Sequence, residues 1–159
     1  MPPPRALRPA GIASAALIVI AAAAHPALVA AAEAVVDEQA RHDETAFHIA
    51  AAAQRFGLPR AWIAAVLRAE SAGDPRATSR AGAMGLMQIM PRTWADLRAR
   101  HRLGHDPYDP RDSVLAGAAY LRELFDRYGA PGFLAAYNAG PGRDEESLAT
   151  GRPLPAETR

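Results

Sequence analysis

Apolar residues recur three and four positions apart from Asp43 onward, and glycine or proline interrupts the pattern at short intervals. This spacing places apolar side chains on one face of an α-helix, and no stretch alternates as a half-buried strand does. The expected fold class is therefore mainly α, in one domain, because 159 residues of which half are hydrophobic suffice for one core. We predict short helices from Asp43 or Glu44 to Arg55, from Pro59 to Gly73, from Asp109 to Gly129 and from Pro131 to Ala139, and another that starts at Pro91.

The same pattern predicts which side chains are buried. The residues of the first helix that are expected to face inward are Phe47, Ala50, Ala51 and Phe56. The clearest helix follows Asp109, a residue type that caps helix N-termini, and it has Pro110 in its first turn. Its predicted buried stripe consists of Leu115, Ala118, Leu121, Leu124, Phe125 and Tyr128.

The charge pattern predicts no nucleic-acid partner. All basic residues are arginines, and they alternate with acidic residues along the chain, so the formal net charge is only +1. A nucleic-acid-binding domain gathers its basic residues into a stripe or patch. The chain has no cysteine, which excludes disulfides, thiolate chemistry, cysteine-ligated metals and a lipoprotein anchor.

Residues 1–32 have the layout of a secretory signal peptide. Arg5 and Arg8 precede an apolar run over residues 11–24, and small residues follow before the expected cleavage site at Ala32. A membrane anchor is the alternative, but a histidine and a proline end the run before it reaches the roughly 20 apolar residues that a span requires. We therefore expect export to the periplasm and a mature protein that is nearly neutral.

Glu70 stands out because it lies on the apolar side of the second predicted helix. Trp62, Val66 and Glu70 are spaced four apart, so one helix face carries all three. Burial among apolar side chains and the negative end of the helix dipole both favour the protonated carboxyl group. A carboxyl group that stays protonated near neutral pH can donate a proton to a leaving oxygen, as glycosidic bond cleavage requires. The alternative is a surface glutamate that turns outward and pairs with Arg68 or Arg76.

Three motifs resemble those of the soluble lytic transglycosylase family, the lysozyme-like enzymes that cut peptidoglycan. They are Glu70-Ser71 after an apolar helix, AGAMGLMQIMP over residues 81–91, and AYNAGPGR over residues 136–143. Three motifs in this order are much more specific than one. The resemblance covers most of the expected mature chain, and it implies a lysozyme-like domain of several short helices around a sugar-binding cleft.

The resemblance implies a role for particular side chains. Glu70 would be the single catalytic acid and base, and the residues expected to line the cleft around it are Ser71, Met87, Gln88, Tyr137 and Asn138. Neutral side chains of these kinds suit hydroxyl and N-acetyl groups and do not stabilise an ionised glutamate. Structural alternatives are that Met87 fills the core, that Tyr137 plugs a helix interface and that Asn138 ends a helix. No metal and no cofactor are predicted.

One carboxyl group suffices for the reaction that the resemblance implies. Most glycosidases use two, but here Asp74 is expected in a turn and Asp96 on the surface. In the family's reaction Glu70 would protonate the oxygen between N-acetylmuramic acid and N-acetylglucosamine. It would then take the proton of the muramoyl C6 hydroxyl, which closes on C1 and gives a 1,6-anhydro end without water. Two rival hypotheses are a lysozyme-type hydrolase and a non-catalytic peptidoglycan-binding module.

A metal enzyme is the weakest hypothesis. His101 and His105 lie four apart, but Gly104 lies between them and no glutamate accompanies the pair. We expect both histidines to be loop or surface residues.

The motifs and composition predict four regions. These are a signal peptide over residues 1–32, an N-terminal lead-in over residues 33–46, a catalytic domain over residues 47–143 and a polar C-terminal segment over residues 144–159. Family members commonly carry another tyrosine on a helix after the third motif, so truncation of the last segment, with reduced activity, stays open. The expected partner is the glycan strand of peptidoglycan, bound by a monomer. Association with a secretion or conjugation apparatus also stays open.

Overall fold

The computed structural model describes residues 26–139. Its elements are the helices α1 (Pro26–Phe56), α2 (Arg60–Ser71), α3 (Pro91–His101), α4 (Pro110–Tyr128) and α5 (Gly132–Ala139). Isolated bridges are the only β-structure in this part of the chain, which confirms the mainly α fold class. None of the helices within these residues is both long and apolar enough to cross a membrane. The predicted apolar run over residues 11–24 and the segment 144–159 lie outside the described residues.

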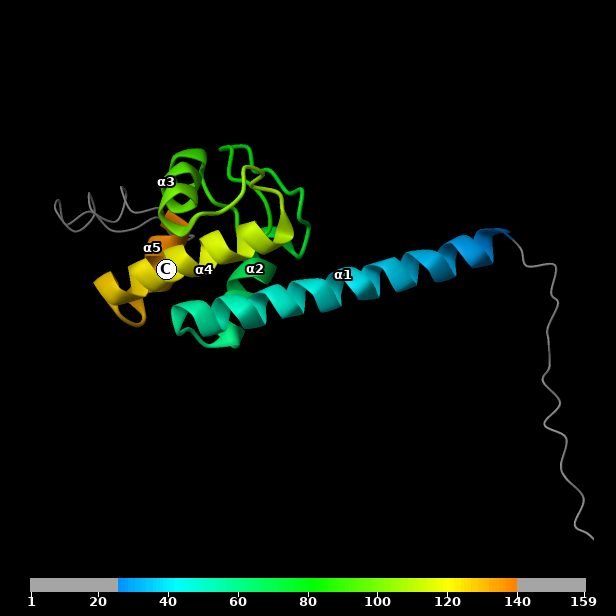
Figure 1. Ribbon diagram of the computed structural model, residues 1–159, viewed down its shortest axis with the longest axis horizontal. Helices are drawn as coiled ribbons and strands as arrows, with labels where there is room; N and C mark the ends of the chain where they lie inside the picture. The colour runs from blue at the N-terminus through cyan, green and yellow to red at the C-terminus, as the bar shows by residue number, and fades with distance from the viewer. Residues whose placement is uncertain (1–25, 140–159) are drawn as a thin grey trace, which may run out of the picture. The chain divides into compact units, whose positions relative to one another are not determined.

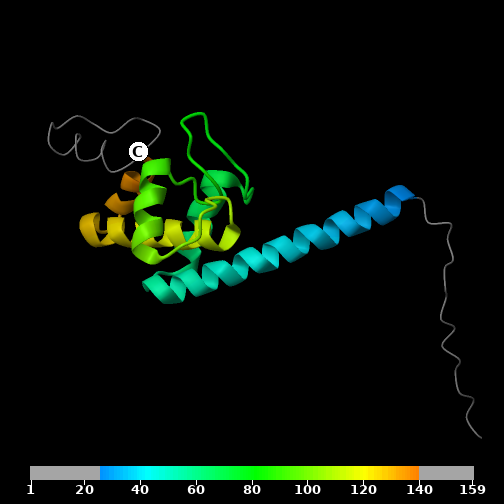
Figure 2. The same cartoon turned by 45° about the horizontal axis from the view of Figure 1, so that its top comes forward.

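Helix α4 is the central helix, and α2, α3 and α5 all contact it (Figures 1 and 2). Its predicted N-cap is confirmed, because the Asp109 side chain accepts a hydrogen bond of 2.9 Å from the backbone N–H of Asp112. The helix ends at Gly129, which has a φ of 63°. The predicted stripe is buried or partly buried throughout, and every side chain from Asp112 to Leu121 is buried as well. Burial on all sides is what a helix surrounded by other helices requires.

Helix α1 is longer than predicted, and it buries a different face. The chain divides into two compact units between Asp37 and Glu38, so only the part of α1 from Glu38 onward belongs with the other helices. The prediction that Phe47 and Ala51 face inward is wrong, because Phe47 is 70% exposed and Ala51 is exposed too. Phe56 packs against the core as predicted, and the other α1 residues that do so are Ile49, Ala52 and Ala53. These positions are three or four residues apart, as predicted for a helix, but they lie on a different face of α1 from Phe47 and Ala51.

The loop between α2 and α3 folds back on itself and is held by backbone pairing. Two isolated bridges join Thr78 to Met84 and Met84 to Ile89. Gly85 has a φ of 71°, and a Cβ atom there would lie only 2.5 Å from the carbonyl oxygen of Pro107. Only glycine fits such a conformation and such a close approach. The glycine-rich motif therefore serves to bring this loop against the segment that precedes α4.

Candidate active site

Glu70 is the second-to-last residue of α2, and its side chain is partly buried. The helix ends there because Ala72 takes a left-handed φ of 53° and its N–H bonds to the carbonyl of Arg68. Burial raises the pKa of the Glu70 carboxyl group above its ordinary value, in the direction predicted from the sequence. Among residues 26–139 no salt bridge or hydrogen bond holds this carboxyl group, so the pairing with Arg68 or Arg76 is not found.

Glu70 lies in a hollow of about 280 Å³ between α2 and α5, which we call the Glu70 pocket. The other described residues that line it are Val66, Ala69, Leu134, Tyr137 and Asn138. Glu70 is the only acid among them, and three of its neighbours are apolar. Apolar neighbours, with no cation among the described lining residues, disfavour the ionised carboxylate, which explains the direction of the pKa shift.

Tyr137 links the third motif to the second. Its hydroxyl group donates a hydrogen bond of 2.8 Å to the carbonyl oxygen of Met87, and its ring lies 5.3 Å from the ring of Tyr120. Burial raises the pKa of Tyr137 well above its ordinary value, and the nearby Glu70 and Tyr120 act in the same direction. The hydroxyl group therefore keeps its proton and ties α5 to the loop between α2 and α3.

Met87 lies in the core, and its side chain does not line the Glu70 pocket. The residue has no exposed area, and its side chain packs against Gly117 of α4, where a Cβ atom would lie 2.5 Å from it. Its backbone N–H donates to the Ser113 hydroxyl oxygen at 3.4 Å. This arrangement corrects the expectation that the side chain lines the cleft, since a side chain without exposed surface cannot contact a sugar. The packing alternative describes Met87 here.

Gln88 and Ser71 use their polar groups to shape the backbone beside the pocket. Gln88 has a φ of 46°, and its side-chain amide donates to the carbonyl of Ala77 at 3.0 Å. The Ser71 hydroxyl group donates to the carbonyl of Leu67 at 3.1 Å and accepts the N–H of Gly73 at 3.2 Å. Neither residue is among the described residues that line the pocket, whereas Asn138 is and has an exposed side chain.

Two α4 residues that support the site were missed from the sequence. Ser113 is buried behind Met87, and Gly117 makes room for the Met87 side chain. Their small size is no signal by itself, because Ala116, Ala118 and Ala119 of the same helix are small as well. The histidine pair has other contacts, since His105 bonds to Arg98 and the His101 ring packs on Phe56.

Comparison with known proteins places these features in a family. A model of the transglycosylase SLT domain matches residues 47–155. The chain is 44% identical over 93 residues to a transglycosylase of Enterobacteria phage PRD1, which covers 58% of this chain and 33% of the phage protein. It is 37% identical over 93 residues to the soluble lytic murein transglycosylase of Escherichia coli, which covers 54% of this chain and 14% of that protein.

A solved structure agrees with these relatives. The fold is similar to that of an inactive mutant of the lytic transglycosylase Slt from Pseudomonas aeruginosa, with a TM-score of 0.57 and 33% identity. This match covers 69% of the present chain and 19% of the other. The chain thus spans no more than 33% of the length of these relatives.

Proposed function

This chain belongs to the transglycosylase SLT family, and from that premise we propose that it is a peptidoglycan lytic transglycosylase. It cleaves the β-1,4 bond between N-acetylmuramic acid and N-acetylglucosamine and leaves 1,6-anhydromuramoyl ends. The observation that carries this proposal is Glu70, the one carboxyl group among the described residues of its pocket, where burial raises its pKa. Such a group is suited to hold a proton until a leaving oxygen needs it.

In the proposed reaction the protonated Glu70 donates its proton to the glycosidic oxygen while the bond from that oxygen to muramoyl C1 breaks. The electron pair of this bond leaves with the oxygen, and positive charge develops at C1. The ionised Glu70 then accepts the proton of the C6 hydroxyl group, whose oxygen forms the new bond to C1. The carboxyl group ends the cycle protonated. Because the attack is intramolecular, it has an entropic advantage over attack by a separate molecule.

The residues around Glu70 take different roles in this proposal. Asn138 offers an exposed amide to hydroxyl and N-acetyl groups of the sugar. Tyr137 acts as a positioning residue, because its hydroxyl group is engaged with the Met87 carbonyl. Ser71 ends α2 and Gln88 lies on the loop between α2 and α3, both beside the pocket. They stay predicted contacts of a longer glycan.

We also propose that residues 1–32 are removed on export and that the mature protein acts in the periplasm as a monomer. In this proposal residues 33–46 lead into a catalytic domain over residues 47–143. The charged and apolar layout of the N-terminus supports export. Helix α1 runs unbroken from Pro26 to Phe56, so it crosses both proposed boundaries and marks neither of them. Amino-terminal sequencing of protein from the periplasmic fraction is expected to begin at Glu33. A mature protein that begins at Met1 would contradict the signal peptide.

The reaction is tested with the purified chain on isolated sacculi and mass analysis of the soluble products. Anhydro ends are expected from the wild type, and Glu70→Gln is expected to lower the rate by about 100- to 10,000-fold. Asp96→Asn, which changes an exposed acid on α3, is the matched control and should keep the wild-type rate. Reducing ends would indicate a hydrolase instead, and binding without any release would indicate a non-catalytic module.

A further inference from the structure

Leu134 is a large apolar residue in the wall of the Glu70 pocket, and it is 48% exposed. Of the large apolar residues that are exposed within residues 26–139, it alone lines this pocket. We infer that Leu134 is a specificity-determining residue, which contacts the methyl end of a sugar's acetamido group and so selects the N-acyl group of the substrate. The inference deepens the proposed function and rests on it, because an acetamido group meets Leu134 only if a glycan strand binds at Glu70.

Two buried side chains fix the orientation of α5, so the fold sets the position of Leu134. Phe133 is buried, and the centroid of its ring lies 4.8 Å from that of the Trp62 ring. Tyr137, four residues later, is buried as well and donates its hydroxyl hydrogen bond to the Met87 carbonyl. Residues four apart share a helix face, so both anchors lie on the inner face of α5. Leu134, the residue after the first anchor, is thereby turned toward the pocket.

Leu134 and Asn138 form the pocket-facing side of α5. They are four residues apart, so their Cβ atoms lie about 5–6 Å from each other on the helix surface. Both are exposed and both line the Glu70 pocket. This side of α5 therefore offers an apolar contact beside an amide. An acetamido group has the same two parts, and it can place its methyl group on Leu134 while its amide meets Asn138.

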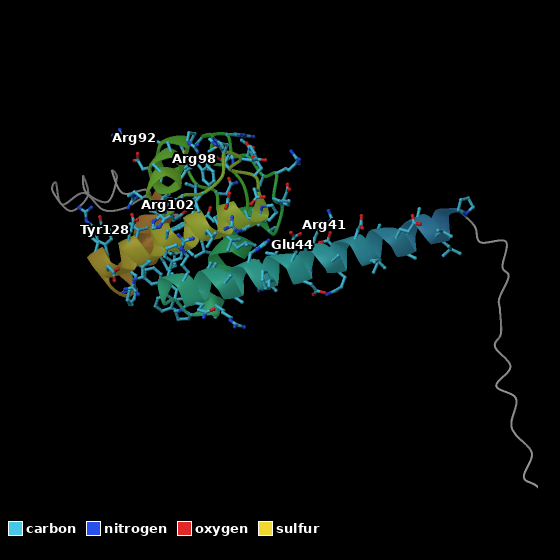
Figure 3. All side chains as sticks on the ribbon, viewed as in Figure 1. Arg41, Glu44, Arg92, Arg98, Arg102 and Tyr128 are labelled. Atoms are coloured by element: carbon cyan, nitrogen blue, oxygen red, sulfur yellow. The ribbon has the colours of Figure 1, made fainter. Side chains whose placement is uncertain are left out.

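The other groups of a glycan strand suit this wall less well. A hydroxyl group pressed against a leucine loses hydrogen bonds with water. Figure 3 shows arginines on α1 and α3, but no arginine is among the described residues that line the Glu70 pocket. A carboxylate would therefore find no cation there, and an ammonium group would stabilise the ionised form of Glu70 and so oppose proton donation. A neutral group with an apolar end fits the wall best.

The size of the Glu70 pocket gives Leu134 its influence on the acyl group. A volume of about 280 Å³ is at the small end of the range for ligand sites, which suits one sugar and its substituents. A leucine in so small a pocket limits the length of an acyl group that points toward it. Replacement by alanine removes three carbon atoms, so it should weaken the contact with acetyl and leave room for propionyl.

The first test compares glycan strands that are chemically deacetylated and then reacylated with formyl, acetyl or propionyl groups. The kcat/KM of the full wild-type chain is expected to be about fourfold lower on formyl than on acetyl strands, because one buried methyl contact is lost. In Leu134→Ala this penalty should fall below about twofold, and the rate on propionyl strands should rise relative to acetyl strands. Each variant is compared with itself, so a loss of folded protein cancels in the ratio.

Two further variants serve as controls in this test. Phe47→Ala removes an exposed apolar side chain of α1 that does not line the pocket, and it should keep the wild-type ratios. Leu134→Met keeps an apolar side chain of similar volume, so it should keep most of the formyl penalty. A formyl penalty of the same size in the wild type and in Leu134→Ala would overturn the inference.

The second test measures binding without catalysis, in the Glu70→Gln background. The probes are triacetylchitotriose and its N-formyl counterpart, titrated against the full chain by calorimetry. Neither probe has a lactyl group, so the lactyl methyl of the muramoyl sugar cannot cause a difference between them. The acetylated probe is expected to bind about fourfold more tightly, and the added change Leu134→Ala should remove this difference.

The two proposals fail in different ways. Equal binding of the two probes, no binding of the acetylated probe, or a difference that persists without Leu134 would overturn the inference. If Glu70→Gln shows the expected binding preference but the wild type releases no product from glycan strands, only the proposed catalytic activity is refuted.

Discussion

Replacing Tyr137 with phenylalanine should destabilise the protein by leaving a buried carbonyl group without a partner. The hydroxyl group of Tyr137 donates to the Met87 carbonyl at 2.8 Å, and both residues are buried. That carbonyl accepts no other hydrogen bond within the described residues. An unsatisfied buried acceptor costs about 1–3 kcal/mol. With a urea dependence of about 1.5 kcal/mol per molar, a loss of about 2 kcal/mol lowers the unfolding midpoint by about 1 M.

The assay is urea unfolding followed by far-ultraviolet circular dichroism, with Tyr108→Phe as the matched control. Tyr108 also loses a hydrogen bond of 2.9 Å, to Thr78, but that bond is exposed and water can replace the lost partner. The control should lose no more than about 0.5 kcal/mol. If both variants shift the midpoint equally, the Met87 carbonyl has another partner available and the reasoning is refuted.

Three further predictions concern the loop, α4 and the acid. Gly85→Ala should lower the free energy of unfolding by about 2–4 kcal/mol, because φ is 71° and the new Cβ atom would meet the Pro107 carbonyl. The control Gly57→Ala has a positive φ but open space around it, so it should lower this free energy by only about 1–2 kcal/mol in the same urea assay. Asp109→Ala should cost about 0.5–2 kcal/mol by removing the N-cap of α4, and an unchanged midpoint would contradict this. The raised pKa means that folded Glu70 holds its proton more tightly than the unfolded chain does, so stability is lost as pH rises from 4.5 through the raised value. Urea midpoints should therefore show Glu70→Gln gaining on the wild type between acid and neutral pH, and a constant difference would contradict the assignment.

Helix α4 was predicted well because its signals are local. Asp109 and Gly129 act on backbone groups within one turn of themselves, so their effect does not depend on the rest of the fold. The apolar stripe was also readable from spacing alone. Spacing alone did not reveal which helices surround α4. The burial of the remaining α4 side chains could therefore be learned only from the packed helices.

Local sequence signals did not predict which face of α1 is buried. Phe47 is a large apolar residue at a helical spacing, and the sequence offered no reason to leave it exposed. The small residues Ala52 and Ala53 are buried instead, because a helix presents whichever face its neighbours cover. Met87 is a similar case, since its motif indicates a site residue and its contact with Gly117 makes it part of the core.

The sequence by itself determined the helical class, the limits of α4 and the position of one glutamate on an apolar helix face. These follow from backbone preferences and side-chain spacing, which act over a few neighbouring residues. Only the tertiary structure decided that Tyr137 reaches Met87 across 50 positions and that α5 completes the Glu70 pocket. Burial and charge environment belong to surfaces that several helices form together, so no single segment encodes them.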